Sequence, residues 1–335
     1  LNMCTSILQI AKDGTHLLSR TMDWYRMGSM PLFTPRDYSW KSVYDHHEYK
    51  NKYALIGGGG PHDDEVDVSD GINEWGLSVQ KLTFSNGSIL STQRNSEKTQ
   101  LAPFELPFYL LGNFKSVAEI EAYLSEIELM TDEFADQAYG HPELHFTVLD
   151  KTGRIVVIEP TKQPMEVRNN PLGILTNSHN FEKQINQLED YMEFTPAFKA
   201  GTVPLNTSKV TTGNFSGKKV PTGSFTPGSR FIRAAYDKER ANIPANEDEA
   251  VISSWHLLNS VSVPKSTDHQ RTYSIYRAAT SSESLSYYFE PYDRMSIVKL
   301  QLTPEMLNWT KPKFYSVIND LVVDNLNKRD EVPGL

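Results

Sequence analysis

The sequence has a single cysteine, Cys4, among 335 residues, and no run of apolar residues long enough to cross a membrane. One cysteine excludes an intrachain disulfide, so the fold needs no oxidising compartment. A membrane-spanning helix would need ~20 consecutive apolar residues. Basic residues are also in deficit, with 33 Lys and Arg against 42 Asp and Glu and a formal net charge of −9. This balance argues against a nucleic-acid surface, which normally carries clustered basic residues.

The lone cysteine lies almost at the start of the chain, behind Leu1, Asn2 and Met3. If those three residues are removed, a thiol and a free α-amine share one residue. An α-amine has a pKa of ~8, so it can accept the proton when the sulfur attacks a carbonyl. This is the N-terminal-nucleophile form of covalent catalysis. The alternative is a buried thiol in a first strand, because free cysteine is among the most buried residue types.

A β-hairpin is predicted at the N-terminus. Residues 4–10 alternate as a strand, Asp13-Gly14 is a two-residue turn signal, and residues 16–23 form the returning strand. A turn centred between residues 13 and 14 places Cys4 opposite Asp23, with their Cβ atoms ~5 Å apart. We therefore expect the Asp23 carboxylate to orient the N-terminal amine.

Arg20 lies an odd number of residues from Asp23, so an ideal strand places it on the other face. It would reach the sulfur only across a β-bulge. From the pattern alone, Asp23 is equally a solvated residue at a strand end and Arg20 a surface charge.

Further elements follow from local patterns, and hydrophobic residues make up 39% of the chain, enough for a sizeable core. Ser116 and Asn246 are predicted helix caps, and residues 143–160 a hairpin. Strands are also expected at 272–279, 284–289 and 295–302, with a long Gly-, Ser- and Thr-rich excursion at 200–228. Gly57–Gly60 is interpreted as a bend at a strand end. Strands at both ends with helices between them favour two stacked sheets with helices outside.

Seven motifs in order along the chain resemble those of the choloylglycine hydrolase family, which includes bile salt hydrolases and penicillin V acylases. They are Met3-Cys4-Thr5-Ser6, Leu18-Ser-Arg20-Thr-Met-Asp23-Trp24, Asp70-Gly-Ile-Asn-Glu-Trp-Gly-Leu77, Leu175-Thr-Asn177-Ser178, Thr226-Pro-Gly-Ser-Arg230-Phe-Ile-Arg233-Ala-Ala-Tyr236, Val263-Pro-Lys265 and Ser286-Tyr-Tyr-Phe-Glu-Pro-Tyr-Asp293. The resemblance implies one domain over residues 4–335, with residues 1–3 a propeptide or initiator remnant. It also implies an α+β fold, the four-layer αββα sandwich of N-terminal-nucleophile hydrolases.

The resemblance implies a role for each matching residue. Cys4 would be the nucleophile, its own amine the base, and Asp23 the group that orients the amine. Arg20 and Arg230 would lie near the sulfur and amine, where cationic neighbours favour a thiolate. Without the family, Arg230 is only a helix-start residue after a Pro-Gly turn. This chemistry requires no metal and no cofactor, and no His cluster offers a convincing set of metal ligands.

The oxyanion hole is expected to comprise the Asn177 side chain and the backbone N–H of Thr83. From the sequence alone, Asn177 is more simply a turn-forming residue. Position 83 departs from the family, since relatives similar to bile salt hydrolases carry Asn there and those similar to penicillin V acylases carry Tyr. The segment Ser19–Trp24 is closer to the acylase branch.

By analogy, the acyl pocket involves loops near residues 22–28, 58–68 and 130–142. Its candidate apolar residues are Met22, Trp24, Tyr25, Met27 and Phe134, each equally plausible as ordinary core. Residues 62–65, with Asp67, form an acidic loop. We expect it to favour neutral acyl chains, although a merely solvated loop is the simpler interpretation.

The prediction is therefore a cysteine amidohydrolase that cleaves linear, non-peptide C–N amide bonds of N-acylated small molecules. Penicillin V-like substrates come first, conjugated bile salts second and N-acyl homoserine lactones third. Two rivals remain: a thiol hydrolase with an internal Cys–His pair, and an inactive member that only binds acylated amines. Family analogy also suggests a tetramer in the bacterial cytoplasm, or a periplasmic or secreted protein if a signal peptide was removed.

Overall fold

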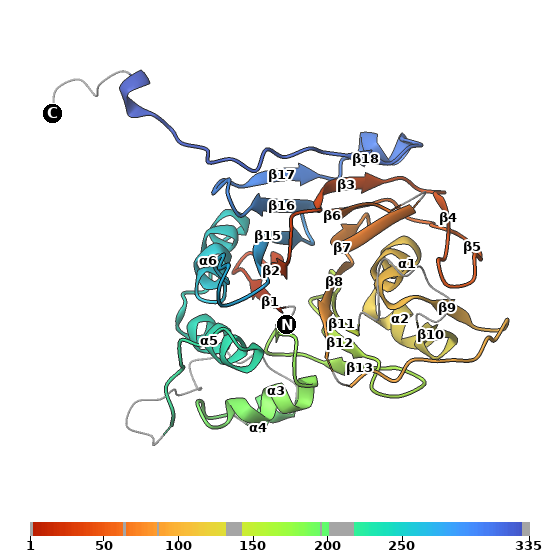
Figure 1. The fold of residues 1–335 in the computed structure, drawn as a ribbon, viewed down its shortest axis with the longest axis horizontal. Coiled ribbons are helices and arrows are strands. Elements are labelled where there is room, and N and C mark those ends of the chain that lie inside the picture. The colour runs from red at the N-terminus through yellow and green to blue at the C-terminus, as the bar shows by residue number, and fades with distance from the viewer. Residues whose placement is uncertain are drawn as a thin grey trace.

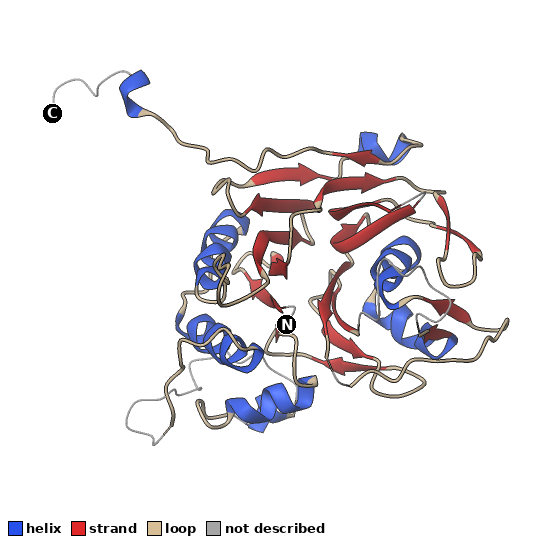
Figure 2. Ribbon diagram, viewed as in Figure 1, coloured by secondary structure: helices blue, strands red, loops and turns tan. Residues whose placement is uncertain are grey.

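The structure is a computed structural model that describes residues 3–62, 65–85, 87–131, 143–194, 196–200 and 218–329. Two β-sheets are stacked at its centre, with helices on both outer sides (Figure 1, Figure 2). This arrangement confirms the predicted α+β, αββα sandwich.

The first sheet has six strands in the order β14-β1-β2-β15-β16-β17. Their bounds are β1 Met3–Ile10, β2 His16–Trp24, β14 Ile174–Leu175, β15 Tyr273–Ser281, β16 Ser286–Pro291 and β17 Val298–Gln301. Strand β2, near the N-terminus, thus pairs with β15 from residues 273–281, and β1, which carries Cys4, lies between β14 and β2.

The second sheet has eight strands in the order β13-β12-β11-β8-β7-β6-β3-β18. Their bounds are β3 Met30–Thr34, β6 Leu55–His62, β7 Glu65–Asn73, β8 Ser78–Thr83, β11 Leu144–Leu149, β12 Ile155–Glu159, β13 Glu166–Asn169 and β18 Lys313–Phe314. Two small sheets, β4 Ser39–Lys41 with β5 Glu48–Lys50 and β9 Thr99–Leu101 with β10 Ile127–Leu129, lie beside it.

Helices cover the outer face of each sheet (Figure 1). Those beside the first sheet are α3 Phe181–Leu188, α4 Pro196–Lys199, α5 Pro227–Arg240 and α6 Glu247–Asn259, and those beside the second are α1 Leu106–Asn113 and α2 Val117–Tyr123. Short 3-10 turns occupy Pro103–Glu105, Leu124–Glu126, Pro304–Asn308 and Leu326–Lys328. The core between the sheets contains Cys4 together with Phe33, Ile56, Ile72, Val157, Tyr287 and Phe289.

Helix caps confirm the local predictions. The Ser116 side chain accepts a hydrogen bond from the N–H of Glu119, and the Asn246 side chain from that of Glu249. Such caps satisfy backbone donors that a helix start leaves free. Helix α2 ends at Tyr123, where the chain tightens into a 3-10 turn and then enters β10. The hairpin at 143–160 is present as β11 and β12.

The predicted register of the N-terminal hairpin is wrong by one residue. Cys4 lies opposite Met22, and Asp23 lies opposite Met3. The connection is longer than the predicted two-residue turn, because Ala11 N–H donates to Thr15 O at 2.9 Å and closes a three-residue loop. Gly14 adopts a φ of 93° there, and the Asp13 side chain accepts from the Thr15 N–H. The shift places Arg20, opposite Ser6, on the same face as Cys4 without a bulge at this point.

The glycine run Gly57–Gly60 lies inside β6, not at a bend at a strand end. Its role is close approach: a Cβ at Gly58 would overlap the hydroxyl of Tyr287, and one at Gly57 the backbone of β7. The run lets the Tyr287 hydroxyl of the first sheet reach Asp70 of the second, at 2.6 Å.

Candidate functional site

Cys4 is buried between the two sheets, with 2% of its surface exposed. Its backbone N–H donates to Oδ1 of Asn177 at 2.5 Å, and its Sγ lies 3.9 Å from Sδ of Met22. The loop that follows β14 supplies Asn177, so the order of strands in the first sheet brings the side chain to the residue. Two residues 173 positions apart in sequence therefore meet at the candidate nucleophile.

Arg230 projects from the first turn of α5 into the same place. Thr226 caps this helix and Pro227 follows at its first position, both favourable for a helix start. The Nη1 of Arg230 donates to Cys4 O at 2.7 Å and to Thr5 Oγ1 at 2.6 Å, and its Nη2 donates to Asn177 Oδ1 at 2.8 Å. Burial lowers the pKa of Arg230, against the charges of Asp23 and Cys4.

Asp23 is fully buried, and its position in β2 places its side chain on the opposite face of the first sheet from that of Cys4. Ser274 Oγ donates to its Oδ1 at 2.6 Å. Its Oδ2 accepts no hydrogen bond from the described residues and lies 3.9 Å from Arg230 Nη1. Burial raises the pKa of Asp23 to about 6, although the Arg230 charge lowers it. The carboxylate thus offers an open acceptor close to the start of β1.

Arg20 is held by a buried polar network that the sequence does not assign. Its Nη1 lies 3.3 Å from Asp70 Oδ2, and its Nη2 donates to Met22 Sδ at 3.5 Å. The hydroxyls of Tyr276 and Tyr287 donate to the two oxygens of Asp70, each at 2.6 Å. Burial opposes the charge of Arg20, but the charges of Cys4 and Asp70 outweigh it and the pKa of Arg20 is raised.

The same network shows what sequence reasoning missed. Asp70 belongs to one of the family motifs, yet nothing local shows that it meets Arg20, Tyr276 and Tyr287. These contacts span from 50 to 217 positions along the chain. The glycines of β6 are the one local signal, because an apolar strand without side chains indicates a close approach.

Thr83 and Asn177 are brought together. The N–H of Phe84 donates to Glu143 O toward β11 at 2.7 Å. In an antiparallel pair, the N–H and C=O groups of successive residues point alternately toward and away from the partner strand. Since Phe84 bonds toward β11, the N–H and C=O of Thr83 point away from it. Asn177 Nδ2 donates to Thr83 O at 3.0 Å. An amide nitrogen carries two hydrogens, so one donor of Asn177 remains for another acceptor.

A cavity of about 340 Å³ adjoins this centre through Met22. Its lining includes Met22, Trp24, Phe104, Leu144 and Ile275, together with polar residues. Of the predicted substrate-binding residues, Met22 and Trp24 line it. Tyr25 is 51% exposed and packs edge-on against Trp24 instead. Met27 packs against the core between the sheets, and Phe134 lies outside the described residues.

The predicted acidic loop is only partly described. Asp63 and Asp64 lie outside the described residues. Asp67 forms an ion pair with Lys81 inside the cavity wall, so a neighbouring ammonium balances its charge. Asp67 therefore does not supply the uncompensated negative charge expected from the sequence.

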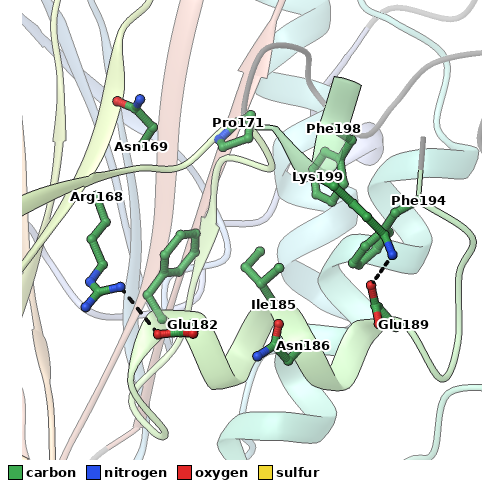
Figure 3. Close-up of a pocket in the computed structure, with 11 residues that line it drawn as sticks. Arg168, Asn169, Pro171, Glu182, Ile185, Asn186, Glu189, Phe194, Phe198 and Lys199 are labelled. Atoms are coloured by element: carbon green, nitrogen blue, oxygen red, sulfur yellow. Dashed lines mark ion pairs between the residues drawn. The ribbon is translucent and has the colours of Figure 1, made fainter. Parts of the chain in front are cut away.

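A second cavity of about 370 Å³ lies against α3 (Figure 3). Phe194 and Phe198 contribute apolar surface, and the ion pairs Arg168–Glu182 and Lys199–Glu189 flank it. It shares no lining residue with the cavity beside Met22.

Among the described residues, no three or more His, Cys, Asp or Glu side chains gather as a metal site would require. No helix within the described ranges is long and apolar enough to span a membrane.

The fold and this centre define a class: a four-layer sandwich with a cysteine, an amide and two guanidinium groups gathered at the start of one strand. The model of the choloylglycine hydrolase family of linear amide C–N hydrolases matches residues 4–315. The chain belongs to this family and is a hydrolase that acts on linear amides.

Relatives and solved structures agree with this assignment. The chain is 29% identical to a bile salt hydrolase/transferase of Clostridium perfringens, over 97% of this chain and 100% of that protein. It is 31% identical to a bile salt hydrolase/transferase of Lactiplantibacillus plantarum, over 92% of this chain and 95% of that protein. A variant of the conjugated bile acid hydrolase from Clostridium perfringens superposes with a TM-score of 0.81 and 28% identity, over 97% and 100%. Penicillin V acylase from Agrobacterium tumefaciens superposes with a TM-score of 0.68 and 20% identity, over 90% of this chain and 87% of that chain. At this identity the likeness shows the fold alone.

Proposed function

We propose that this enzyme hydrolyses the amide bond of conjugated bile salts, releasing the amino acid from the steroid acid. The support comes from relatives that are similar over almost the whole chain and are named for this activity. The likeness to penicillin V acylase supports only the fold. This reverses the order that the segment Ser19–Trp24 favoured, in which penicillin V came first.

The observation that carries the hydrolytic part of the proposal is the bridge made by Asn177. One side chain accepts from Cys4 N and donates to Thr83 O, at 2.5 and 3.0 Å. The residue with the thiol and both candidate oxyanion donors therefore meet at one point. Such preorganised donors are usually worth several orders of magnitude in rate for acyl transfer.

In the proposed mechanism, removal of residues 1–3 frees the Cys4 amine. The sulfur attacks the acyl carbon while the amine takes the thiol proton. The free N–H of Asn177 Nδ2 and the backbone N–H of Thr83 stabilise the oxyanion. As the C–N bond breaks, the ammonium passes its proton to the leaving amine. Water then attacks the thioester and restores the thiol.

The buried charges would hold the amine in place. An ammonium on Cys4 has three donors, and Asn177 Oδ1 already accepts one hydrogen bond at this nitrogen. The open Oδ2 of Asp23 is the nearby carboxylate suited to a second. Arg230 bonds both Cys4 O and Asn177 Oδ1, so two groups beside the amine are held in place.

Amine release tests the substrate. Protein whose mass corresponds to a Cys4 N-terminus is assayed with glycocholate, taurocholate and penicillin V at equal concentration, with Cys4→Ala as the blank. We expect a higher kcat/KM for the two bile salts. Faster hydrolysis of penicillin V, or of N-acyl homoserine lactones added as a third class, would overturn the proposal. Activity with residues 1–3 retained would instead support a Cys–His mechanism.

A further inference from the structure

The cavity beside Met22 contains a charged pair in a wall of mixed character, which also includes the polar residues Arg26, Ser29, His62 and Ser69. Lys81 of β8 and Asp67 of β7 form an ion pair there, and their side chains are 11% and 27% exposed. Leu144, Phe104 and Ile275 line the same cavity. Partly buried charges lose hydration, which is costly unless partners restore the lost hydrogen bonds.

The partners within the described chain leave the pair incomplete. An ammonium has three N–H donors, and Asp67 Oδ1 is the only hydrogen-bond acceptor of Lys81 among the described residues. The Phe104 ring covers one side of the ammonium, with its centroid 5.7 Å from Nζ. Asp67 Oδ2 takes no hydrogen bond from Lys81. Donor and acceptor capacity thus remain side by side in the cavity wall.

The chemistry of that pairing selects among ligand groups. A hydroxyl can accept from Lys81 and donate to Asp67 at the same time. A carboxylate or sulfonate would satisfy Lys81 but meet the negative charge of Asp67. An apolar group would displace water from both charges without replacing the hydrogen bonds that the water made. A hydroxyl therefore fits the pair best.

We infer that Lys81 and Asp67 are specificity-determining residues that recognise a hydroxyl on the substrate's acyl group. The inference rests on the proposed function and narrows it, because the acyl groups of bile salts are steroids that differ in their ring hydroxyls. It also disfavours the phenoxyacetyl group of penicillin V, which has no hydroxyl. A site built to bond a hydroxyl discriminates strongly against analogues that lack it.

The test compares substrates that differ only in hydroxylation. Glycine conjugates of cholate and of hydroxyl-free cholanate form one pair, and N-decanoylglycine with N-(10-hydroxydecanoyl)glycine forms a second pair without a steroid. We expect kcat/KM to favour the hydroxylated steroid by at least ~10-fold. The double variant Lys81→Met/Asp67→Leu removes both charges together, so neither is left buried without a partner, and should abolish the preference.

A matched control is the ion pair Lys98–Glu126, which is also partly exposed and does not line the cavity. Lys98→Met/Glu126→Leu should keep the wild-type preference. Binding of cholate and cholanate to the Cys4→Ala protein, measured by calorimetry, supplies a readout that needs no turnover.

The outcomes separate the inference from the proposed function. If steroid conjugates are not hydrolysed but the hydroxylated decanoyl substrate is preferred, the bile salt assignment fails and the hydroxyl site stands. Equal kcat/KM values within each pair, with equal affinities of the Cys4→Ala protein, overturn the hydroxyl site. So does a preference that survives in the Lys81/Asp67 double variant.

Discussion

At the scale of single residues, the buried carboxyl of Asp23 has a measurable consequence for stability. Its folded-state pKa is about 6, above the reference value of 3.8, because burial disfavours the charged form. Between these values the folded chain holds a proton that the unfolded chain has lost. By linkage, stability falls as pH rises from ~4 to ~6, by about 3 kcal/mol for this one group.

We therefore predict that Asp23→Asn flattens the pH dependence of stability in protein that retains residues 1–3. The amide has nearly the same shape but cannot ionise, so the loss between pH ~4 and ~6 should largely disappear. Denaturant unfolding at several pH values measures the effect. Ser274→Ala is the complementary variant: it removes a hydrogen bond that lowers the pKa of Asp23, so the loss should extend to higher pH. Parallel curves for wild type and Asp23→Asn would contradict the prediction.

At the scale of elements, α3 holds the loop that carries Asn177. The buried side chain of Gln184 accepts from Thr176 N–H at 3.0 Å, and its Nε2 donates to Thr176 O at 3.3 Å and to His179 O at 2.6 Å. Thr176 and His179 flank Asn177. One glutamine therefore fixes the backbone on both sides of the candidate oxyanion donor.

We predict that Gln184→Leu lowers kcat by roughly 10–100-fold with a smaller change in KM, because a misplaced donor weakens the transition state most. If Gln184 acts through Asn177, the same substitution made on Asn177→Ala should cost little more. Steady-state kinetics of the four proteins give the coupling. Gln9→Leu is the matched control, since Gln9 is also buried and bonded at both ends, to Ser253 and Ser254. Additive losses for Gln184 and Asn177 would exclude a positioning role.

The elements also show how far sequence reasoning reaches. The caps at Ser116 and Asn246 and the hairpin at 143–160 were predictable, because residues close in the chain make them. The N-terminal register was not, because the loop length depends on a bond from the Thr15 N–H to the Asp13 side chain and on the positive φ of Gly14. The one-residue difference in register places Arg20 on the same face of the sheet as Cys4.

The candidate site divides in the same way. Motif resemblance was sufficient to nominate Cys4, Asn177 and Arg230, which the structure brings within hydrogen-bond distance of one another. The motifs did not predict that Asp70 holds Arg20 or that Gln184 holds the loop of Asn177, because these contacts depend on how distant or neighbouring elements pack in the fold. Lys81 was passed over because its partner lies on the neighbouring strand, β7.

At the scale of the whole molecule, the segment after β18 runs back over β17, and its last described residues extend away from the body of the protein (Figure 1). Asn319 and Val322 still bond to residues 293 and 294, at 3.0 and 3.1 Å. The apolar side chains of this tail are nonetheless largely exposed: Ile318, Leu321, Val322, Val323 and Leu326. Contiguous exposed apolar residues commonly mark a surface that packs against another protein.

We propose that the tail packs against a second copy of the chain, which would give the homo-oligomer that family analogy suggests. Light scattering after gel filtration should then report a mass well above the 38.0 kDa of one chain. Replacing Leu321, Val323 and Leu326 by Ser should shift the protein toward the monomer, because burial of each large apolar side chain is worth ~1.5–3 kcal/mol. Ile252→Ser is the control, since Ile252 is exposed to a similar extent on α6. A monomeric wild type, or a triple variant of unchanged mass, would show that the tail does not hold copies together.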